Sequence, residues 1–465
     1  MAHPRSLRPR AVPLVASCLV AAAAAAALAG PPLPGLQATP TAYPSQRFAA
    51  TYRTFDIRTG AVNGTAAWHW TPTGGNCCEV YVTSTGKGEL LEYGGSLPFR
   101  SADHGKTWEQ IVFATPLYNG EGAIVAGPGG DLFGVGWDAY TGDHLQGVRY
   151  SAATRKWEVA EAPLKTPVFD REWISYVKGP FVVDGNTVPY VTLVRGGTVT
   201  KAVEFLAADG MSYTTVTSPY ADVQRQSGEP RYFKIPVVKN PDADNWQPNP
   251  GTFTLPLNGG GVLLLNNPED DLGSPAARLN PTTLTWERVT LAFKPTGVVR
   301  QDSRGWLTMV TQKGNAVELK LSRDGGVTWK ATTLALPASH PKSAQGVDVK
   351  VNGRLGQAVV ATRADNKAGQ GQDVVWRVDI RGAQPTLMKA YLVGLGNAPT
   401  AIGLVAGAAA DRFDFPSVTL LPDGRIAMSF QDATTPRHVA RAGVPGTGQV
   451  LNPSGGHSPA LAILD

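Results

Sequence analysis

Two short segments of the chain place carboxylates beside a guanidinium, a combination that can take part in acid–base catalysis or in binding charged groups. One is Asp170-Arg171-Glu172-Trp173, and the other is Asp411-Arg412-Phe413-Asp414. Together with Glu121 they supply acidic groups that could act as general acid and general base on a bound substrate. The same set could instead hold a cation, or form salt bridges that brace neighbouring elements. Any of these roles requires a fold that brings the segments together.

A turn pattern that occurs twice indicates what that fold is. Ser101–Trp108 and Ser322–Trp329 both follow Ser-x-Asp-x-Gly-x-Thr-Trp. Ser and Asp side chains accept hydrogen bonds from the amides of a tight turn, and Gly allows the positive φ that the turn needs. Because this local chemistry accounts for Asp103 and Asp324, we expect both to be structural. We expect packing roles for four tryptophans: Trp108, Trp157, Trp286 and Trp329.

The pattern resembles the Asp-box of the bacterial neuraminidase repeat, which occurs in sialidase-like β-propellers. Weaker copies lie at 151–157, 209–213 and 280–286, and short apolar runs separated by Gly-rich turns fill the intervals. After a first unit over 79–111, first strands are expected to begin at residues 123, 173, 252, 298, 347 and 417. The chain is therefore predicted to be all-β, a propeller of seven four-stranded antiparallel blades. Six blades are the alternative, because the sialidases proper have six.

Closure of the ring and the position of the site follow from the repeat. A strand over Phe48–Ile57 is predicted to complete the seventh blade and so join the N-terminal to the C-terminal part. The segments that precede the first strands should gather around the axis on one face. The candidate catalytic residues are therefore Asp170, Glu172, Glu121 and Asp414, and the candidate substrate-binding residues are Arg171, Trp173, Arg412, Arg231 and Tyr232.

The resemblance implies an exo-sialidase-like glycoside hydrolase, in which three arginines hold the substrate carboxylate and a Tyr paired with Glu is the nucleophile. The Arg-Ile-Pro motif of that family is absent before Ser101, and the nearest string, Tyr232-Phe233-Lys234-Ile235-Pro236, has Lys in place of the bidentate Arg. Arg231, Arg300 and Tyr232 with Glu229 are present, but their spacing does not single them out. The alternative function is a non-catalytic propeller that binds a carbohydrate or a protein at the cell surface.

The N-terminal residues predict export. Arg5, Arg8 and Arg10 precede an Ala-rich run and the small-residue site Ala27-Leu28-Ala29, which predicts a signal peptide over residues 1–29. Val15-Ala16-Ser17-Cys18 is similar to a lipoprotein box, so lipid anchoring at Cys18 is the alternative to a secreted chain. A disordered leader is expected over 30–47. A single propeller domain is expected over 48–465, with an insertion around 218–249.

Composition and charge limit the classes of partner that the chain is expected to bind. The net charge is +5, and no cluster of Lys and Arg indicates a nucleic-acid surface. No apolar run beyond the signal is long enough to span a bilayer. The adjacent Cys77 and Cys78 could form a vicinal disulfide or remain thiols, and no His lies near them with metal-ligand spacing. We expect a monomer without metal or cofactor, with no motif to support a bound calcium, and a glycan, glycoconjugate or protein as partner.

Overall fold

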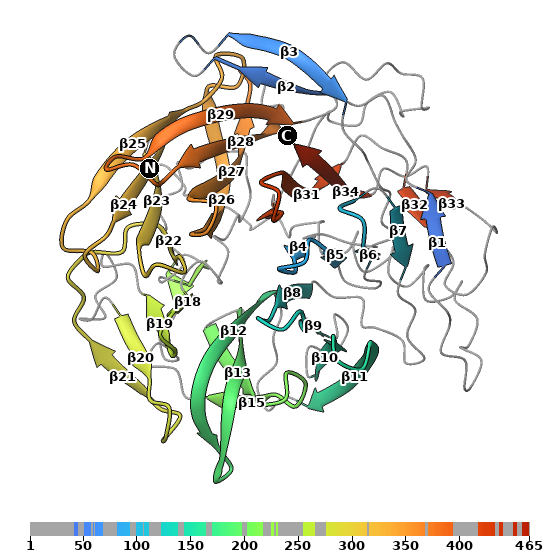
Figure 1. Cartoon of the computed structure of the whole chain (residues 1–465), viewed down its shortest axis with the longest axis vertical. Coiled ribbons are helices and arrows are strands. Elements are labelled where there is room, and N and C mark those ends of the chain that lie inside the picture. The colour runs from blue at the N-terminus through green and yellow to red at the C-terminus, as the bar shows by residue number, and fades with distance from the viewer. Residues whose placement is uncertain are drawn as a thin grey trace, which may run out of the picture.

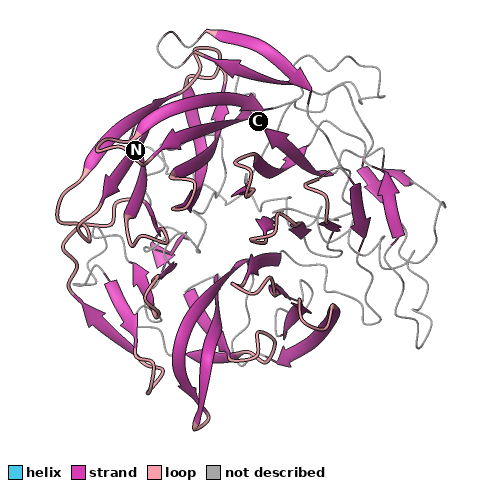
Figure 2. Cartoon of the chain, viewed as in Figure 1, coloured by secondary structure: helices cyan, strands magenta, loops and turns pink. Residues whose placement is uncertain are grey.

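A computed structural model of the chain provides the structure. It describes residues 41–44, 51–56, 59, 61–67, 81–93, 99–105, 107–110, 122–137, 144–163, 170–197, 202–216, 225–226, 229–230, 254–265, 276–313, 316–367, 371–393, 417–432, 437–439, 450–452 and 458–464. Every regular element in this part of the chain is a β-strand (Figure 2).

Seven antiparallel sheets surround a common axis, as Figure 1 shows, which confirms the predicted seven-bladed propeller. The blades form in chain order, because each blade is built from strands that follow one another along the chain, except that β32 and β33 lie between β31 and β34 of blade seven. Their strands are β4 (Tyr81–Ser84), β5 (Leu90–Tyr93), β6 (Phe99–Ser101) and β7 (Thr107–Gln110) in blade one; β8 (Gly122–Ala126), β9 (Leu132–Trp137), β10 (His144–Ser151) and β11 (Lys156–Pro163) in blade two; β12 (Asp170–Val183), β13 (Asn186–Gly197), β14 (Ala202–Ala207) and β15 (Thr214–Val216) in blade three; β18 (Thr254–Pro256), β19 (Val262–Leu265), β20 (Ala276–Leu279) and β21 (Trp286–Val289) in blade four; β22 (Val298–Gln301), β23 (Leu307–Lys313), β24 (Ala316–Ser322) and β25 (Lys330–Ala335) in blade five; β26 (Lys342–Asn352), β27 (Gln357–Asp365), β28 (Gly371–Asp379) and β29 (Thr386–Val393) in blade six; and β30 (Ser417–Leu420), β31 (Ile426–Asp432) and β34 (Ser458–Leu464) in blade seven.

The first strand of each blade lies innermost. β4, β8, β12, β18, β22, β26 and β30 each contact the first strands of both neighbouring blades, and β30 contacts β4 to complete the circle. We call these seven first strands the axial ring. Their observed starts fall within five residues of the predicted ones, so the phase of the repeat was predicted correctly from the sequence.

The N-terminal strand does not close the seventh blade as predicted. β2 (Thr51–Phe55) pairs antiparallel with β29 and, with β3 (Val62–Ala67), extends the outer edge of blade six. The third strand of blade seven is instead the C-terminal β34, paired with β31. The fourth strand β29 presents a free edge next to which β2 can pair, and sequence periodicity does not distinguish one open edge from another.

Short additional strands lie around this framework. β1 (Thr41–Pro44) falls within the predicted leader and pairs with β7 at the edge of blade one. Within the insertion around 218–249, the structure describes the two-residue strands β16 (Arg225–Gln226) and β17 (Glu229–Pro230). β32 (Arg437–Val439) and β33 (Val450–Asn452) form another two-stranded sheet.

The core lies between blades rather than inside any one of them. Between blades five and six, Val298, Leu319, Val349 and Trp376 belong to one buried cluster. Trp376 is fully buried and its Nε1 donates to the carbonyl of Ala335 in blade five at 3.1 Å. Because each blade presents apolar side chains to both neighbours, the blades stabilise one another in sequence around the ring.

Candidate functional site

The segments predicted to carry the site lead into the axial ring. Asp170 is the first residue of β12, and the pairing of β12 with β13 shifts register between Asp170 and Trp173. Such a bulge changes the direction in which the flanking side chains point. The side chains of Asp170, Arg171, Glu172 and Trp173 lie outside the described residues. Five other predicted site residues lie wholly outside them: Glu121, Arg412, Asp414, Arg231 and Tyr232.

The inner turns, which join the first and second strands of each blade, mark the opposite end of the ring. The Nδ2 of Asn258 in blade four donates to the carbonyl of Ser303 in blade five at 2.7 Å. The Nη2 of Arg354 in blade six donates to the carbonyl of Pro422 in blade seven at 3.2 Å. Because these turns follow the last residues of the first strands, the first residues of those strands lie at the other face of the ring. We call these two faces the turn face and the pre-strand face.

Charged side chains of the axial ring gather on blades five and six. Among the described side chains of its strands, only Arg300 on β22, Asp348 on β26 and Lys350 on β26 are charged, apart from the exposed Lys178 and Lys342. Arg300 and Lys350 are partly buried, and Asp348 is buried at 4% exposure. β26 alternates apolar and charged residues from Val347 to Val351. This alternation is a sequence signal for Asp348 and Lys350, neither of which was among the predicted site residues. Arg300 was named from the sequence, but its spacing did not single it out.

Asp348 connects blade six to blade seven. Its Oδ1 accepts a hydrogen bond from the amide of Val349, and its Oδ2 accepts one from the amide of Val418 on β30, each at 2.8 Å. Ser417 connects blade seven to blade one in the same way, because its Oγ accepts a hydrogen bond from the amide of Val82 on β4 at 3.3 Å. The inner edge of a first strand has no partner strand, so these side chains satisfy amides that would otherwise be unpaired.

The electrostatics of this charged group follow from burial. Burial lowers the pKa of the Arg300 guanidinium, and the negative charge of Asp348 opposes that effect. Burial also lowers the pKa of the Lys350 ammonium, Asp348 raises it, and the nearby positive charge of Arg300 lowers it further. The three side chains therefore act on one another electrically, although their contacts come from two blades.

The complete Asp-boxes form the outer turns, which join the third and fourth strands, and their polar groups bond to the turn itself. In blade five the Oγ of Ser322 donates to Asp324 at 2.8 Å and accepts from the amide of Gly326 at 2.8 Å. Asp324 also accepts from the amide and the hydroxyl of Thr328, at 2.9 Å and 2.6 Å. Blade one repeats the arrangement, with Ser101 bonded to Asp103 at 2.9 Å and to the amide of Gly105 at 2.7 Å. The structural role predicted for both aspartates is confirmed.

The remaining outer turns use the same chemistry with other residues. Asp209 in blade three accepts from the amides of Met211 and Ser212, each at 2.8 Å. Asn280 in blade four accepts from the amides of Thr282 and Thr283. Blade six, for which no box was predicted, has Asp379 in this position, accepting from the amide of Arg381 at 2.8 Å. A side-chain oxygen near the end of the third strand is thus the common feature of the outer turns of blades one, three, four, five and six.

Tryptophans of the outer strands serve packing, as predicted for those whose side chains are described. Trp329 lies edge-on to Phe293, with ring centroids 5.4 Å apart, and Trp157 lies 5.0 Å from Tyr150. Trp286 is partly buried against the core between blades three and four. The side chain of Trp108 lies outside the described residues.

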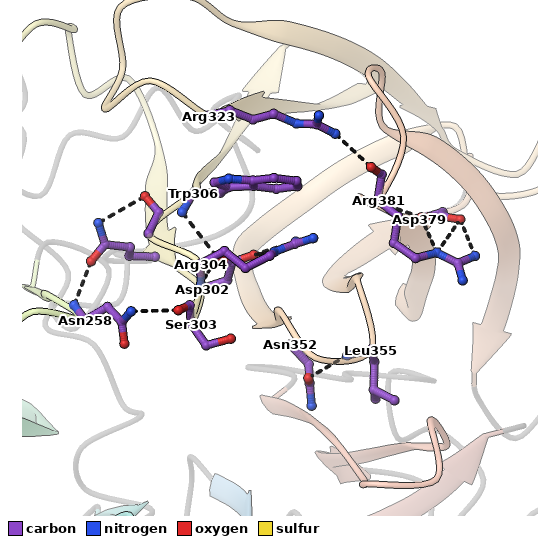
Figure 3. Close-up of polar contacts among 12 residues, drawn as sticks. Asn258, Asp302, Ser303, Arg304, Trp306, Arg323, Asn352, Leu355, Asp379 and Arg381 are labelled. Carbon is purple, nitrogen blue, oxygen red and sulfur yellow. Dashed lines mark hydrogen bonds and ion pairs between the residues drawn. The ribbon is translucent and has the colours of Figure 1, made fainter.

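The turn face between blades five and six also holds an aromatic ring between two arginines. The indole of Trp306 lies between the side chains of Arg304 and Arg323 in Figure 3, with their Cζ atoms 3.7 Å and 4.0 Å from the ring centroid. Arg304 is paired with the buried Asp302 at 2.6 Å. Arg323 donates to the carbonyl of Arg381 in blade six at 2.8 Å. Since both guanidinium groups already have partners, this stack supports the structure of the turn face.

Two kinds of site are not found in the described residues. They contain no group of three or more His, Cys, Asp or Glu placed to hold a metal ion. In the same part of the chain there is no helix of the length and apolar character needed to cross a bilayer. Cys77 and Cys78 lie outside it.

Comparisons with known proteins find similarity to solved structures only. No protein-family model and no curated protein sequence matches the chain. A protein of unknown function from Dyadobacter fermentans is 12% identical, with 93% of this chain and 100% of that chain covered and a TM-score of 0.39. The NanB sialidase from Streptococcus pneumoniae is 14% identical over 83% of this chain and 68% of its own, with a TM-score of 0.34. The Aleuria aurantia lectin, in complex with Fucα1-6GlcNAc, is 10% identical over 75% and 84%, with a TM-score of 0.31.

Proposed function

We propose that the chain is an exported, sialidase-like Asp-box propeller that acts on glycans at the pre-strand face. The observation that carries the proposal is the axial ring, in which all seven first strands meet around one axis. Asp170 begins one of these strands, Glu121 directly precedes β8 in the chain, and Asp414 lies three residues before β30. In a ring of this kind, segments far apart in the sequence converge on a single surface.

The residue types of these segments suit a sugar ligand. Carboxylates accept hydrogen bonds from hydroxyls, and a pair of them at a suitable separation can act as acid and base or nucleophile on a glycosidic bond. Arg171 and Arg412 would pair with acidic groups or with those carboxylates, and Trp173 offers an aromatic face for a sugar ring. Arg231 and Tyr232 belong to the insertion between blades three and four and are the further binding candidates. In this proposal, hydrolysis is carried by Asp170, Glu172, Glu121 and Asp414.

The second candidate is a non-catalytic propeller that binds a carbohydrate or protein, and one observation favours it. Within the described residues, the buried carboxylate of the axial ring is Asp348, and both of its oxygens accept hydrogen bonds from backbone amides. A carboxylate held in this way supports the scaffold and does not supply acid and base catalysis. The missing Arg-Ile-Pro motif favours the same candidate.

The two candidates are separated by assaying the mature chain on fluorogenic sialosides and neutral glycosides and on a glycan array. The matched pair of variants is Asp170→Asn and Asp184→Asn, because Asp170 begins β12, Asp184 directly follows its last residue, and both undergo the same chemical change. Asp184 has a φ of 49°, a conformation that Asn tolerates well. For a hydrolase, Asp170→Asn should lower turnover by about a hundredfold or more while Asp184→Asn leaves it unchanged.

Without turnover, retention of the wild type on the array supports the binding protein, provided that Asp170→Asn weakens retention and Asp184→Asn does not. The absence of both turnover and retention would contradict the proposal. Equal behaviour of the two variants would remove Asp170 from the site and leave Glu121 and Asp414 to be tested in the same way.

A further inference from the structure

The charged group of the axial ring contains more positive than negative charge. Arg300 and Lys350 contribute two cations and Asp348 one anion. The other described side chains of the ring are uncharged, apart from the exposed Lys178 and Lys342: they are apolar, carry hydroxyls, such as Ser84 and Thr419, or carry amides, as Gln301 and Asn352 do. The excess positive charge therefore lies at one place, where blades five and six meet near the axis.

Asp348 does not pair with the side chain of Arg300 or of Lys350. Its two oxygens accept from the amides of Val349 and Val418, and neither cation forms a salt bridge with it. The Nη1 of Arg300 donates to the carbonyl of the preceding residue, Val299, at 3.0 Å. Within the described residues, the Lys350 ammonium has no hydrogen bond or ion pair. Among the described residues, Lys350 thus has three donors, and Arg300 most of its five, without acceptors.

A partly buried cation without a partner is costly, because its hydration is reduced and not replaced. This cost appears in the pKa of the Lys350 ammonium. Burial lowers that pKa, and the charge of Arg300 lowers it further. An anion bound between the two side chains would offset this cost. A guanidinium and an ammonium together suit an oxyanion, because the first offers a planar fork of donors and the second a compact point charge.

This location is separate from the pre-strand face. Arg300 lies two residues before Asp302, which begins the inner turn of blade five, and Lys350 lies two residues before Asn352, the last residue of β26. Both are therefore at the turn-face end of their strands, whereas Asp170 is at the first residue of its strand. Both side chains keep part of their exposure to solvent, so a small ion can approach them.

We propose that Arg300 and Lys350 form a binding site for a small oxyanion, with phosphate and sulfate as its best probes, at the turn-face end of the axial ring. The site joins blade five to blade six through the bound ion, beside the direct connection that Asp348 makes between blades six and seven. It is independent of any glycan bound on the other face.

The test is thermal unfolding and calorimetric titration of the full mature chain with sodium phosphate, sulfate or acetate, each against sodium chloride at constant ionic strength. Phosphate or sulfate should raise the unfolding midpoint of the wild type in a saturable way. Lys350→Met and Arg300→Met should weaken the apparent affinity at least about tenfold. The control Lys330→Met removes an exposed lysine of β25 in blade five and should leave the affinity unchanged.

The unfolding temperature of Lys350→Met in chloride shows whether this variant is folded. Met has nearly the same length without a charge, so in chloride the variant should unfold at the same or a higher temperature than the wild type. A preference for acetate over phosphate and sulfate would assign the site to planar carboxylates. A wild type without a saturable response, or one whose response Lys350→Met and Arg300→Met retain in full, would overturn the proposal.

Discussion

In both the outer turns and the axial ring, an aspartate side chain accepts a hydrogen bond from a backbone amide, but the two residues are separated by very different distances along the sequence. In the outer turn of blade five, Asp324 accepts a hydrogen bond from the amide of Thr328, four residues away. In the ring, Asp348 accepts one from the amide of Val418, 70 residues away. The first bond can form within an isolated hairpin. The second can form only when blades six and seven have folded against each other.

The two regions also differ in their exposure to water. Asp324 is exposed, so solvent competes for its hydrogen bonds and screens its charge. Asp348 is 4% exposed, and the amides it satisfies lie on the inner edge of a buried strand. An exposed side chain that stabilises a turn contributes modestly, whereas a buried one that satisfies amides is expensive to lose. The comparison therefore predicts that the loss of the buried Asp348 costs more than the loss of a side chain that stabilises an outer turn.

The largest effect is expected for Asp348→Ala. The change leaves the amides of Val349 and Val418 without their acceptors and removes the negative charge beside Arg300 and Lys350. We expect a loss of about 3 kcal/mol in the free energy of unfolding, since hydrogen bonds to charged groups and buried unpaired donors each cost on the order of 1–3 kcal/mol. Urea unfolding followed by tryptophan fluorescence and circular dichroism measures it.

Ser417→Ala is the matched control within the ring. Ser417 satisfies one amide, that of Val82, through a neutral hydroxyl at 3.3 Å. Its loss should cost about 1 kcal/mol. A cost for Asp348→Ala no larger than that for Ser417→Ala would show that the buried charge adds nothing, and the distinction between the two regions would then rest on distance alone.

A smaller effect is expected in the outer turns from Ser322→Ala. Ser322 is almost fully buried, and its hydroxyl accepts from the amide of Gly326 while donating to Asp324. Without it, the amide has no partner, and we expect a loss of about 1–2 kcal/mol. Ser101→Ala should cost a similar amount, because Ser101 makes the same two bonds in blade one.

The control for these turn variants is Ser303→Ala, an exposed serine in the inner turn of blade five, which should change the stability by less than about 0.5 kcal/mol. Urea midpoints for all three variants, taken under one set of conditions, give the comparison. Unequal costs for Ser322→Ala and Ser101→Ala would mean that the surroundings of the box contribute as much as its own bonds. Those surroundings do differ, since Gly326 lies under Phe293 and Gly105 lies beside Ile463.

The sequence predicted well what is local. The Asp-boxes, the alternation of apolar runs and turns, and the starts of the first strands all depend on residues within about ten positions of each other, so seven blades could be predicted. The strand over Phe48–Ile57 was predicted wrongly to complete blade seven, whereas Thr51–Phe55 pairs with β29 of blade six, because both blades offered an open edge. The outer turn of blade six was missed because Asp379 stands where the box has Ser, and it accepts from the amide two residues on, whereas Ser322 accepts from the amide four residues on.

The same limit applies to sites. Glu121, Asp170, Glu172 and Asp414 were selected because a repeat fixes which segments precede first strands, and this selection needs only local patterns. Asp348 and Lys350 were not selected, since their importance arises from β22 and β30, which pack against β26 from other blades. Alternation of charged and apolar residues in a first strand signals them only when the strand is already known to be innermost.

The smallest effect is the pH dependence of an outer turn. Hydrogen bonds from the hydroxyl and the amide of Thr328, and then from Ser322, lower the pKa of Asp324 from 3.8 to about 2. A carboxyl whose pKa is lower in the folded state stabilises the fold above its unfolded pKa, and this contribution disappears as the pH falls through the folded pKa. The wild type should therefore be more stable than Asp324→Asn above about pH 4, and the difference should close between pH 4 and pH 2.

Thr328→Val sharpens this last prediction, because it removes the hydroxyl that contributes most to the lowered pKa of Asp324 while keeping the amide donor. In that background, the pKa of Asp324 should be nearer its ordinary value, and the window in which Asp324→Asn matters should move to higher pH. Urea midpoints of the four proteins between pH 5 and pH 2 test it, since acid effects elsewhere in the chain cancel in each pair. A constant difference between the wild type and Asp324→Asn over this range would mean that the turn depends on the shape of the Asp324 side chain and not on its charge. The outer turn would then be stabilised by geometry alone, while the axial ring still depends on charge.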